Sequence, residues 1–257
     1  MCLGSRGPTI PPARVLELIG PAGAGKTTLA EGLCRHNAAL SLGPRLQWSS
    51  LPCSVLLSAP ELVPTLALQA LHGIRHTRYE MKLMFHVTAM YHMLRWHAPP
   101  GAAVVMLDHG PVFWLAKLDE FGSRATRTPG FRRWWQRMAT RWAAELHAVI
   151  YVDACDATLL QRIRSRERSH RAKSWSAAEA INYLARYRAG YERIFPVLET
   201  RADLAVLRLD TEHESPSVLA SRIMAVLSLP SPEGVARIQS SPNQLAPLAA
   251  GEGYGGP

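Results

Sequence analysis

The chain has 257 residues, a formal net charge of +9, 47% hydrophobic residues and 19% charged residues. This composition is globular rather than disordered, and no apolar run reaches the length of a membrane span. The N-terminus lacks the apolar core of a signal peptide, and the four cysteines have neither metal-site nor disulfide-framework spacing. A reduced, cytoplasmic setting and no membrane partner are therefore expected.

The first predicted unit is a strand, a glycine-rich loop and a helix. After an irregular lead-in over residues 1–13, Val15–Ile19 is predicted as a buried strand and Thr27–Ala39 as a helix. The sequence between them, GPAGAGKTT, matches the Walker A pattern in the structural context that the pattern requires. Backbone N–H groups and the helix N-terminus would surround phosphate oxygens there. The expected nucleotide-binding residues are Gly20, Pro21, Ala22, Gly23, Ala24, Gly25, Lys26, Thr27 and Thr28.

Two residues of this loop have specific expected roles. Lys26 would reach the β- and γ-phosphates of a nucleoside triphosphate, and the Thr27 hydroxyl would bind Mg²⁺. The expected cofactor set is therefore ATP with Mg²⁺.

The second strand has two candidate positions, Arg45–Ser49 and Ser54–Ser58, and the sequence does not decide between them. Pro60 is expected near the first turn of a following helix. A long helix over Tyr79–Trp96 has apolar residues at helical spacing, and its methionines are expected to pack in the core.

A third strand, Ala102–Leu107, ends in Asp108, and an acidic residue at this end of a central parallel strand points into the ligand crevice. Helices are expected over Pro111–Glu120 and Phe131–Leu146. The second of these interleaves tryptophans with arginines. Nucleic-acid stacking is one reading of that mixture, but a helix that buries its tryptophans and exposes its arginines is favoured.

The last third of the chain continues the alternation of strands and helices. Ala148–Asp153 is a fourth strand, and Asp156 is expected to be the N-cap of the next helix. Six cationic residues then fall within residues 162–173. The remaining predicted elements are a helix in Ser174–Leu198 that begins with a capping box, a strand at Leu204–Asp210 and a helix at Ser215–Leu227.

This order predicts an α/β fold of three layers, with a five-stranded parallel sheet and helices on both faces. The predicted domain spans residues 14–227, and the Pro-, Gly- and Ser-rich residues 228–257 are expected to form a disordered tail.

Phosphoryl transfer requires a phosphate cradle, a metal, cations on the migrating group and a means of orienting the nucleophile. The loop supplies the cradle, and Asp108 would bind Mg²⁺ with Thr27 or contact a substrate hydroxyl. The arginine-rich stretch suits a mobile segment that closes over phosphates. The candidate catalytic residues are Lys26, Asp108 and the cations of this stretch, Arg162, Arg164, Arg166, Arg168 and Arg171.

The chain resembles the nucleoside and nucleotide kinases of the P-loop superfamily, especially thymidylate-kinase-like and deoxynucleoside-kinase-like proteins. The resemblance lies in GPAGAGKTT (20–28), LDHG (107–110) and YVDACDATLLQRIRSRERSHR (151–171), and the element order matches over residues 14–227. It implies the P-loop fold with an arginine-rich LID. It also implies that Arg162 contacts the adenine or the triphosphate, and that Arg166 or Arg168 stabilises the transferred phosphoryl group. Residues 210–213 would lie beside the adenine.

The sequence departs from that family at His109, which stands where relatives carry an arginine after the acidic residue. We therefore expect ATP-dependent transfer to a small nucleoside- or nucleotide-like acceptor, with the acceptor itself left open. The alternatives are a regulatory NTPase without an acceptor, a nucleotide-binding protein without turnover and a nucleic-acid-binding protein. The oligomeric state is open, and a homodimer is one option.

Overall fold

The computed structural model describes residues 14–43, 51–96, 103–166 and 170–228. The lead-in, the candidate strand Arg45–Ser49 and the tail from residue 229 lie outside the described residues.

The centre of the molecule is a five-stranded, wholly parallel sheet in the order β2-β3-β1-β4-β5. Its strands are β1 (Arg14–Ile19), β2 (Leu40–Leu42), β3 (Val104–Asp108), β4 (Ala148–Asp153) and β5 (Ala205–Asp210). The strands are mostly buried, as expected for a parallel sheet that is covered on both faces. The predicted α/β fold class is confirmed.

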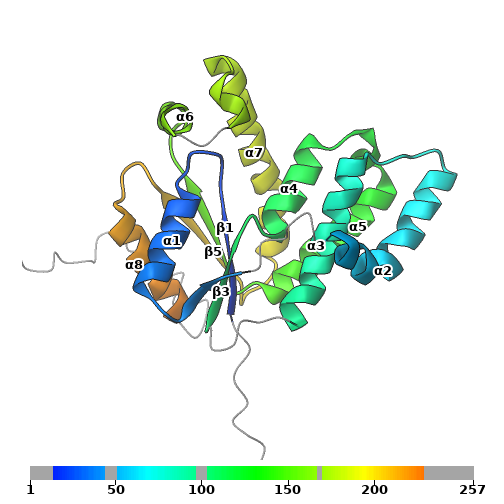
Figure 1. Cartoon of the computed structure of the whole chain (residues 1–257), viewed down its shortest axis with the longest axis horizontal. Helices are drawn as coiled ribbons and strands as arrows, with labels where there is room; N and C mark the ends of the chain where they lie inside the picture. The colour runs from blue at the N-terminus through cyan, green and yellow to red at the C-terminus, as the bar shows by residue number, and fades with distance from the viewer. Residues whose placement is uncertain (1–13, 44–50, 97–102, 167–169, 229–257) are drawn as a thin grey trace, which may run out of the picture.

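Helices cover both faces of the sheet (Figure 1). One face packs against α1 (Lys26–His36), α6 (Asp156–Ser165) and α8 (Pro216–Ser228). The other face packs against a larger group of helices, which is α3 (Arg78–Trp96), α4 (Pro111–Phe121), α5 (Pro129–Glu145) and α7 (Ala177–Leu198), with α2 (Leu51–Leu71) on its outer side. Alternate residues of β1 divide between the two cores, because Leu16 and Leu18 face α1 while Ile19 faces the larger group.

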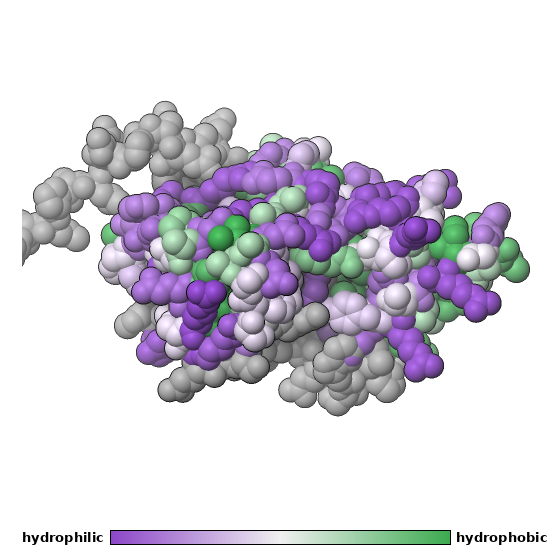
Figure 2. Space-filling view, turned by 90° about the horizontal axis from the view of Figure 1, so that it is seen from above, coloured by the Kyte–Doolittle hydropathy of each residue, from purple (hydrophilic) through white to green (hydrophobic). Residues whose placement is uncertain are grey.

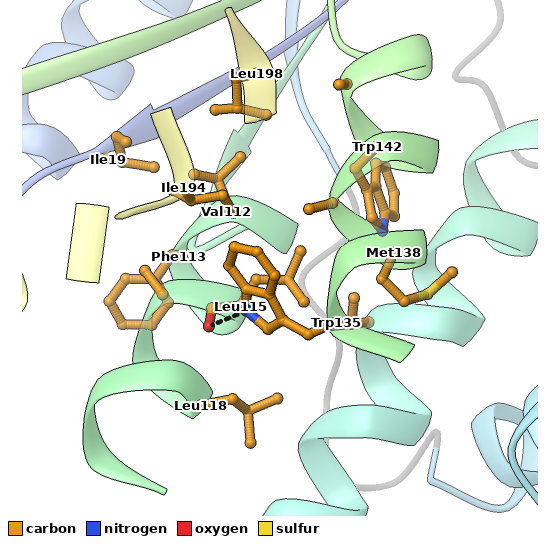
Figure 3. Packing of buried hydrophobic residues seen from close by; sticks show 14 of the residues in the cluster. Ile19, Val112, Phe113, Leu115, Leu118, Trp135, Met138, Trp142, Ile194 and Leu198 are labelled. Carbon is orange, nitrogen blue, oxygen red and sulfur yellow. Dashed lines mark hydrogen bonds between the residues drawn. The ribbon is translucent and has the colours of Figure 1, made fainter. Parts of the chain in front are cut away.

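The tryptophans of α5 lie in the larger core, as predicted. Trp134 and Trp142 are fully buried, and the Trp135 indole donates a hydrogen bond of 3.0 Å to the Leu115 carbonyl of α4 (Figure 3). The arginines around these tryptophans form ion pairs. Arg127 and Arg132 pair with the buried Asp119, and Arg137 and Arg141 pair with Glu61. These ion pairs engage Arg127, Arg132, Arg137 and Arg141 within the protein, without a nucleic-acid partner.

The prediction of the second strand is wrong at Ser54–Ser58, because that segment is helical and belongs to α2. There Ser58 is buried and donates a hydrogen bond of 2.9 Å to the Phe85 carbonyl of α3. The actual β2 consists of three residues beside β3, with only Leu40 buried. So short an edge strand has too few residues to give an alternating pattern.

Three predicted helix starts or ends also differ. The helix expected to begin at Pro60 begins at Leu51 and contains Pro60 and Pro64. The first helix ends at His36 because residues 40–42 already form β2. Asp156 is the first residue of α6 rather than its N-cap, and its carboxylate pairs with Arg188. The capping box of α7 is confirmed, since the Ser176 and Glu179 side chains each accept from the other's backbone N–H.

Candidate functional site

The site lies at the carboxyl edge of the three central strands. The loop of residues 20–25 follows β1, Asp108 ends β3 on one side, and Asp153 ends β4 on the other. Asp108 stands in register with Leu18, close to the end of β1. Open parallel sheets bind their ligands at this edge.

Gly20 and Gly23 of the loop have positive φ angles and leave no room for a Cβ atom. Gly20 has a φ of 144°, and a Cβ there would lie 2.0 Å from the Val152 carbonyl oxygen of β4. Gly23 has a φ of 88°, and a Cβ there would lie 2.7 Å from the Leu159 carbonyl oxygen of α6. The loop is therefore packed tightly against β4 and α6 in a conformation that favours glycine.

The N-terminus of α1 has no side-chain cap. Its N-cap residue is Gly25, with a φ of 84°, and no acidic residue lies in its first turn. The first N–H groups of a helix lack partners within the helix and carry a partial positive charge. This end of α1 can therefore accept a phosphate group.

Lys26 lies over the loop. Its Nζ atom donates hydrogen bonds of 2.8 Å and 2.9 Å to the carbonyls of Gly20 and Pro21. Burial lowers the pKa of Lys26 to about 8, with the carboxylates of Asp108 and Asp153 opposing and the guanidinium of Arg166 adding to the shift. These charges lie within electrostatic reach of one another, although they come from four different elements of the chain.

Thr27 and Asp108 offer a hydroxyl and a carboxylate, the oxygen ligands that Mg²⁺ prefers. The Asp108 side chain is only 6% exposed, and its Oδ1 atom lies 3.4 Å from Nδ1 of His109. The donor chemistry of these two residues fits a hard cation beside the loop.

The sequence analysis did not identify Glu17, although a charged residue in the middle of a buried strand was a signal. Glu17 is fully buried and accepts hydrogen bonds of 2.9 Å from the N–H groups of Val112 and Phe113. It thus caps the N-terminus of α4, which has no side-chain cap of its own. Burial raises the pKa of Glu17 to about 8, against the lowering effect of the backbone hydrogen bonds, and the nearby charge of Asp108 adds to the rise.

The turn between β3 and α4 is built around this carboxylate. A Cβ on Gly110 would lie 2.6 Å from the carboxyl carbon of Glu17. The preceding His109 has a φ of 60°, which is uncommon for a residue other than glycine. Its ring lies 4.5 Å from that of Phe113 and is half exposed. Such strained residues cluster at functional sites.

Arg162 and Arg166 lie on the other side of the loop, at α6. Arg162 donates hydrogen bonds of 2.9 Å and 2.8 Å to the side chain and the carbonyl of Thr211, in the loop after β5. Arg166 follows the last turn of α6, and its positive charge lowers the pKa of Lys26. The structure thus brings Arg166 and Asp108 each within electrostatic reach of Lys26, while Arg168 lies outside the described residues.

Arg188 of α7 is a second residue that the sequence analysis missed. It makes contacts of 2.7 Å and 3.1 Å with the two carboxylate oxygens of Asp153 and one of 2.5 Å with Asp156. It therefore fixes the turn between β4 and α6. Neighbouring Tyr191 donates a hydrogen bond of 3.2 Å to the Gly20 carbonyl, so α7 also supports the phosphate loop.

Aromatic side chains from α4 and α7 gather beside His109. The ring of Phe113 lies 4.7 Å from that of Trp114. It is stacked on the ring of Tyr187 at 5.9 Å, with 12° between the planes of Phe113 and Tyr187. Lys117 Nζ lies 5.1 Å from the centre of the Trp114 ring. Two acidic residues of the same helical layer have partners within the protein: Glu80 accepts hydrogen bonds from Thr77 and Ser123, and Glu61 accepts one from Arg141.

Comparison with known proteins gives a match in structure. No protein-family model matches the chain, and no curated protein matches it. A solved structure of deoxyadenosine kinase from M. mycoides, described with the products dCMP and a flexible dCDP, matches with a TM-score of 0.50 and 14% sequence identity. The match covers 83% of this chain and 98% of that one. A second structure of the enzyme, with bound dCTP, matches with a TM-score of 0.47 and 15% identity, again over 83% of this chain and 98% of that one.

The first of these matches shows that the chain shares the fold of a deoxynucleoside kinase, which is a P-loop fold. Among the described residues, no helix has the combination of length and hydropathy needed to cross a membrane.

Proposed function

We propose that this chain is an ATP-dependent kinase that transfers a phosphoryl group to a hydroxyl of a nucleoside-like acceptor. The observation that carries the proposal is the convergence of Lys26, Asp108 and Arg166 on an uncapped helix N-terminus that follows a glycine loop. Cationic groups and a carboxylate arranged around a phosphate cradle are the parts that phosphoryl transfer requires. The fold shared with deoxyadenosine kinase supports the same class of reaction.

The residues on the donor side would act as follows. The loop of residues 20–25 and the first turn of α1 hold the β- and γ-phosphates, and Lys26 exchanges its carbonyl partners for phosphate oxygens. Arg162 holds the loop after β5 beside the base of ATP. Arg166, and Arg168 of the predicted LID, neutralise charge on the migrating group. Thr27 and Asp108 would hold Mg²⁺, which would neutralise charge on the phosphates.

On the acceptor side, the partly exposed ring of Trp114, which lies beside the buried rings of Phe113 and Tyr187, suits the stacking of a base. They lie beside His109, directly after Asp108 at the end of β3. A nucleoside stacked there would present a sugar hydroxyl to the phosphate loop. In the reaction its oxygen forms a bond to the γ-phosphorus, the bond from that phosphorus to the β–γ bridging oxygen breaks, and ADP leaves as the hydroxyl proton is lost.

The test is ADP formation by the purified chain with ATP and a panel of nucleosides and nucleoside monophosphates. Stimulation by one or more nucleosides, abolished in Lys26→Ala, is the expected result. Stimulation by monophosphates alone would reassign the acceptor. ATP binding with hydrolysis that no acceptor stimulates would overturn the proposal in favour of a regulatory NTPase.

A further inference from the structure

Lys26 and Tyr191 donate hydrogen bonds to the same atom, the carbonyl oxygen of Gly20. The distances to this oxygen are 2.8 Å from Lys26 Nζ and 3.2 Å from the Tyr191 hydroxyl. Among the described residues, no other group donates to it. Gly20 is buried, and a buried carbonyl without a donor destabilises the state in which it occurs. The loop therefore needs at least one of these two donors.

Both carbonyls that Lys26 contacts have a second donor. In the proposed function, the Lys26 amine exchanges the carbonyls of Gly20 and Pro21 for phosphate oxygens. The Pro21 carbonyl then keeps the N–H group of Ala24, which lies 3.4 Å away. The Gly20 carbonyl keeps the Tyr191 hydroxyl. The nucleotide-free loop is thus already arranged for the departure of Lys26.

The Gly20 peptide group has little freedom to find another donor. Gly20 has a φ of 144°, and it packs so closely on β4 that a Cβ would lie 2.0 Å from the Val152 carbonyl oxygen. Packing on the sheet therefore fixes the direction of the Gly20 carbonyl. A donor must come from the side to which the oxygen already points, and Tyr191 occupies that position.

Tyr191 is held firmly in place. Its side chain is fully buried in the larger core, where its ring centre lies 5.6 Å from that of Tyr151. Burial raises the pKa of Tyr191 well above its ordinary value, so the hydroxyl stays protonated and remains a donor. The neighbouring Gly190 lets α7 approach α4, since a Cβ there would lie 3.0 Å from the Ala116 carbonyl oxygen.

The two donors differ in their access to a ligand. Lys26 begins α1 and is partly exposed, whereas Tyr191 belongs to the core. Figure 2 views the molecule from above, the side on which the loop lies in Figure 1, and hydrophilic side chains cover much of that face. A nucleotide that enters from this side can therefore draw Lys26 away without displacing Tyr191.

We propose that Tyr191 is a positioning residue for the phosphate loop, which keeps the Gly20 carbonyl hydrogen-bonded after Lys26 has turned to the phosphates of ATP. The proposal rests on the ATP binding of the proposed function, and it adds a residue of α7 that acts through the loop rather than by contact with the nucleotide. Without the Tyr191 hydroxyl, the nucleotide-bound loop contains an unpaired buried carbonyl, while the nucleotide-free loop does not.

The first test is the Kd for ATP of Tyr191→Phe, measured by titration calorimetry on the full chain. The Kd should rise by roughly ten- to a hundredfold, because only the bound state contains the unpaired carbonyl. The matched control is Tyr183→Phe, which removes from the same helix a hydroxyl that donates over 3.2 Å to Tyr187. The control should bind ATP nearly as tightly as the wild type. An unchanged Kd in Tyr191→Phe overturns the proposal, and so does an equal loss in the control.

Steady-state kinetics separate positioning from general damage to the site. The carbonyl is unpaired both before and during transfer, so Tyr191→Phe should raise the KM for ATP and leave kcat within about threefold of the wild type. A fall in kcat as large as the rise in KM would mean that the variant distorts the site, which contradicts the proposal.

A second test uses the nucleotide-free protein. Urea unfolding compares the wild type, Tyr191→Phe, Lys26→Met and the double variant. Each single variant leaves the Gly20 carbonyl with one donor and the double variant leaves it with none, so the double loss of stability should exceed the sum of the single losses. Additive losses would mean that the two side chains do not share the carbonyl, and the proposal would fail.

The two proposals fail in different ways. A wild type that binds no ATP overturns the proposed function and the role of Tyr191 together. A wild type that binds ATP no more tightly than Tyr191→Phe overturns the role of Tyr191 alone.

Discussion

Gly110 and Glu17 lie so close together that a Cβ on Gly110 would stand 2.6 Å from the carboxyl carbon of Glu17. The carboxylate occupies that space in order to accept the N–H groups of Val112 and Phe113 at the start of α4. The contact joins the central strand to the turn that carries Asp108 and His109. The position of two candidate site residues therefore depends on a side chain in the middle of β1.

Gly110→Ala is expected to destabilise the protein by about 1–3 kcal/mol, because the added methyl group displaces the Glu17 carboxylate and breaks its caps on α4. Thermal or urea unfolding measures the change. Gly32→Ala is the matched control, since Gly32 lies within α1 and a Cβ there meets no atom within 4 Å. That control should stabilise the protein by about 0.5–1 kcal/mol. A Gly110→Ala variant as stable as the control would contradict the role given to Glu17.

The buried carboxyl group also predicts a dependence of stability on pH. The pKa of Glu17 is raised to about 8 in the folded chain from an ordinary value of 4.5, so between these values the folded state binds more protons than the unfolded state. Its contribution to stability is present below about pH 4.5 and is lost as the pH rises through about 8, by at most about 1.4 kcal/mol per pH unit.

The measurement is urea unfolding of the wild type and Glu17→Gln at a series of pH values. Since glutamine does not titrate, the difference between the two free energies of unfolding isolates the contribution of Glu17. The difference should change progressively between about pH 5 and about pH 8, with the wild type losing more stability than the variant. Parallel profiles across this range would mean that Glu17 is already ionised in the folded chain.

Local patterns predicted the parts of the site that are contiguous in the chain. The phosphate loop, the strand before it and the end of β3 at Asp108 could be identified because each lies within a few consecutive residues. Glu17 and Arg188 could not, because their partners lie 95 and 35 residues away in the sequence and only the folded sheet brings them together. The predictions of the second strand and of the start of α2 were wrong for a different reason. Proline favours the first turn of a helix, which placed the predicted start at Pro60, yet α2 runs through Pro60 and Pro64 and packs on α3.

Lys26 should make ATP binding depend on pH. Its pKa is lowered to about 8 in the free protein, and phosphate groups placed beside it would raise that pKa, so binding takes up a proton above about pH 8. The Kd for ATP should therefore rise between about pH 8 and about pH 9.5, by up to about tenfold per pH unit. Titration calorimetry in buffers of different ionisation enthalpy would detect the proton uptake directly.

Lys26→Arg is the control for this profile, because arginine stays protonated throughout the range. Whatever affinity that variant retains should vary little with pH. An equally steep profile in Lys26→Arg would assign the titration to another group.

Arg166 should act on turnover more than on ATP binding. It lies after the last turn of α6, where its charge reaches Lys26, whereas Arg164 in the last turn is exposed. A cation that meets the phosphoryl group chiefly during transfer stabilises the transition state more than the ground state, so its loss lowers kcat. Arg166→Ala is expected to reduce kcat by about a hundredfold or more and to change the KM for ATP only a few-fold. Arg164→Ala removes the same charge two residues earlier in the chain and should leave both constants close to wild type. If Arg166→Ala instead weakened ATP binding as much as turnover, Arg166 would be a ground-state ligand of the triphosphate. If the two variants behaved alike, the arginines of this segment would act only through their net charge.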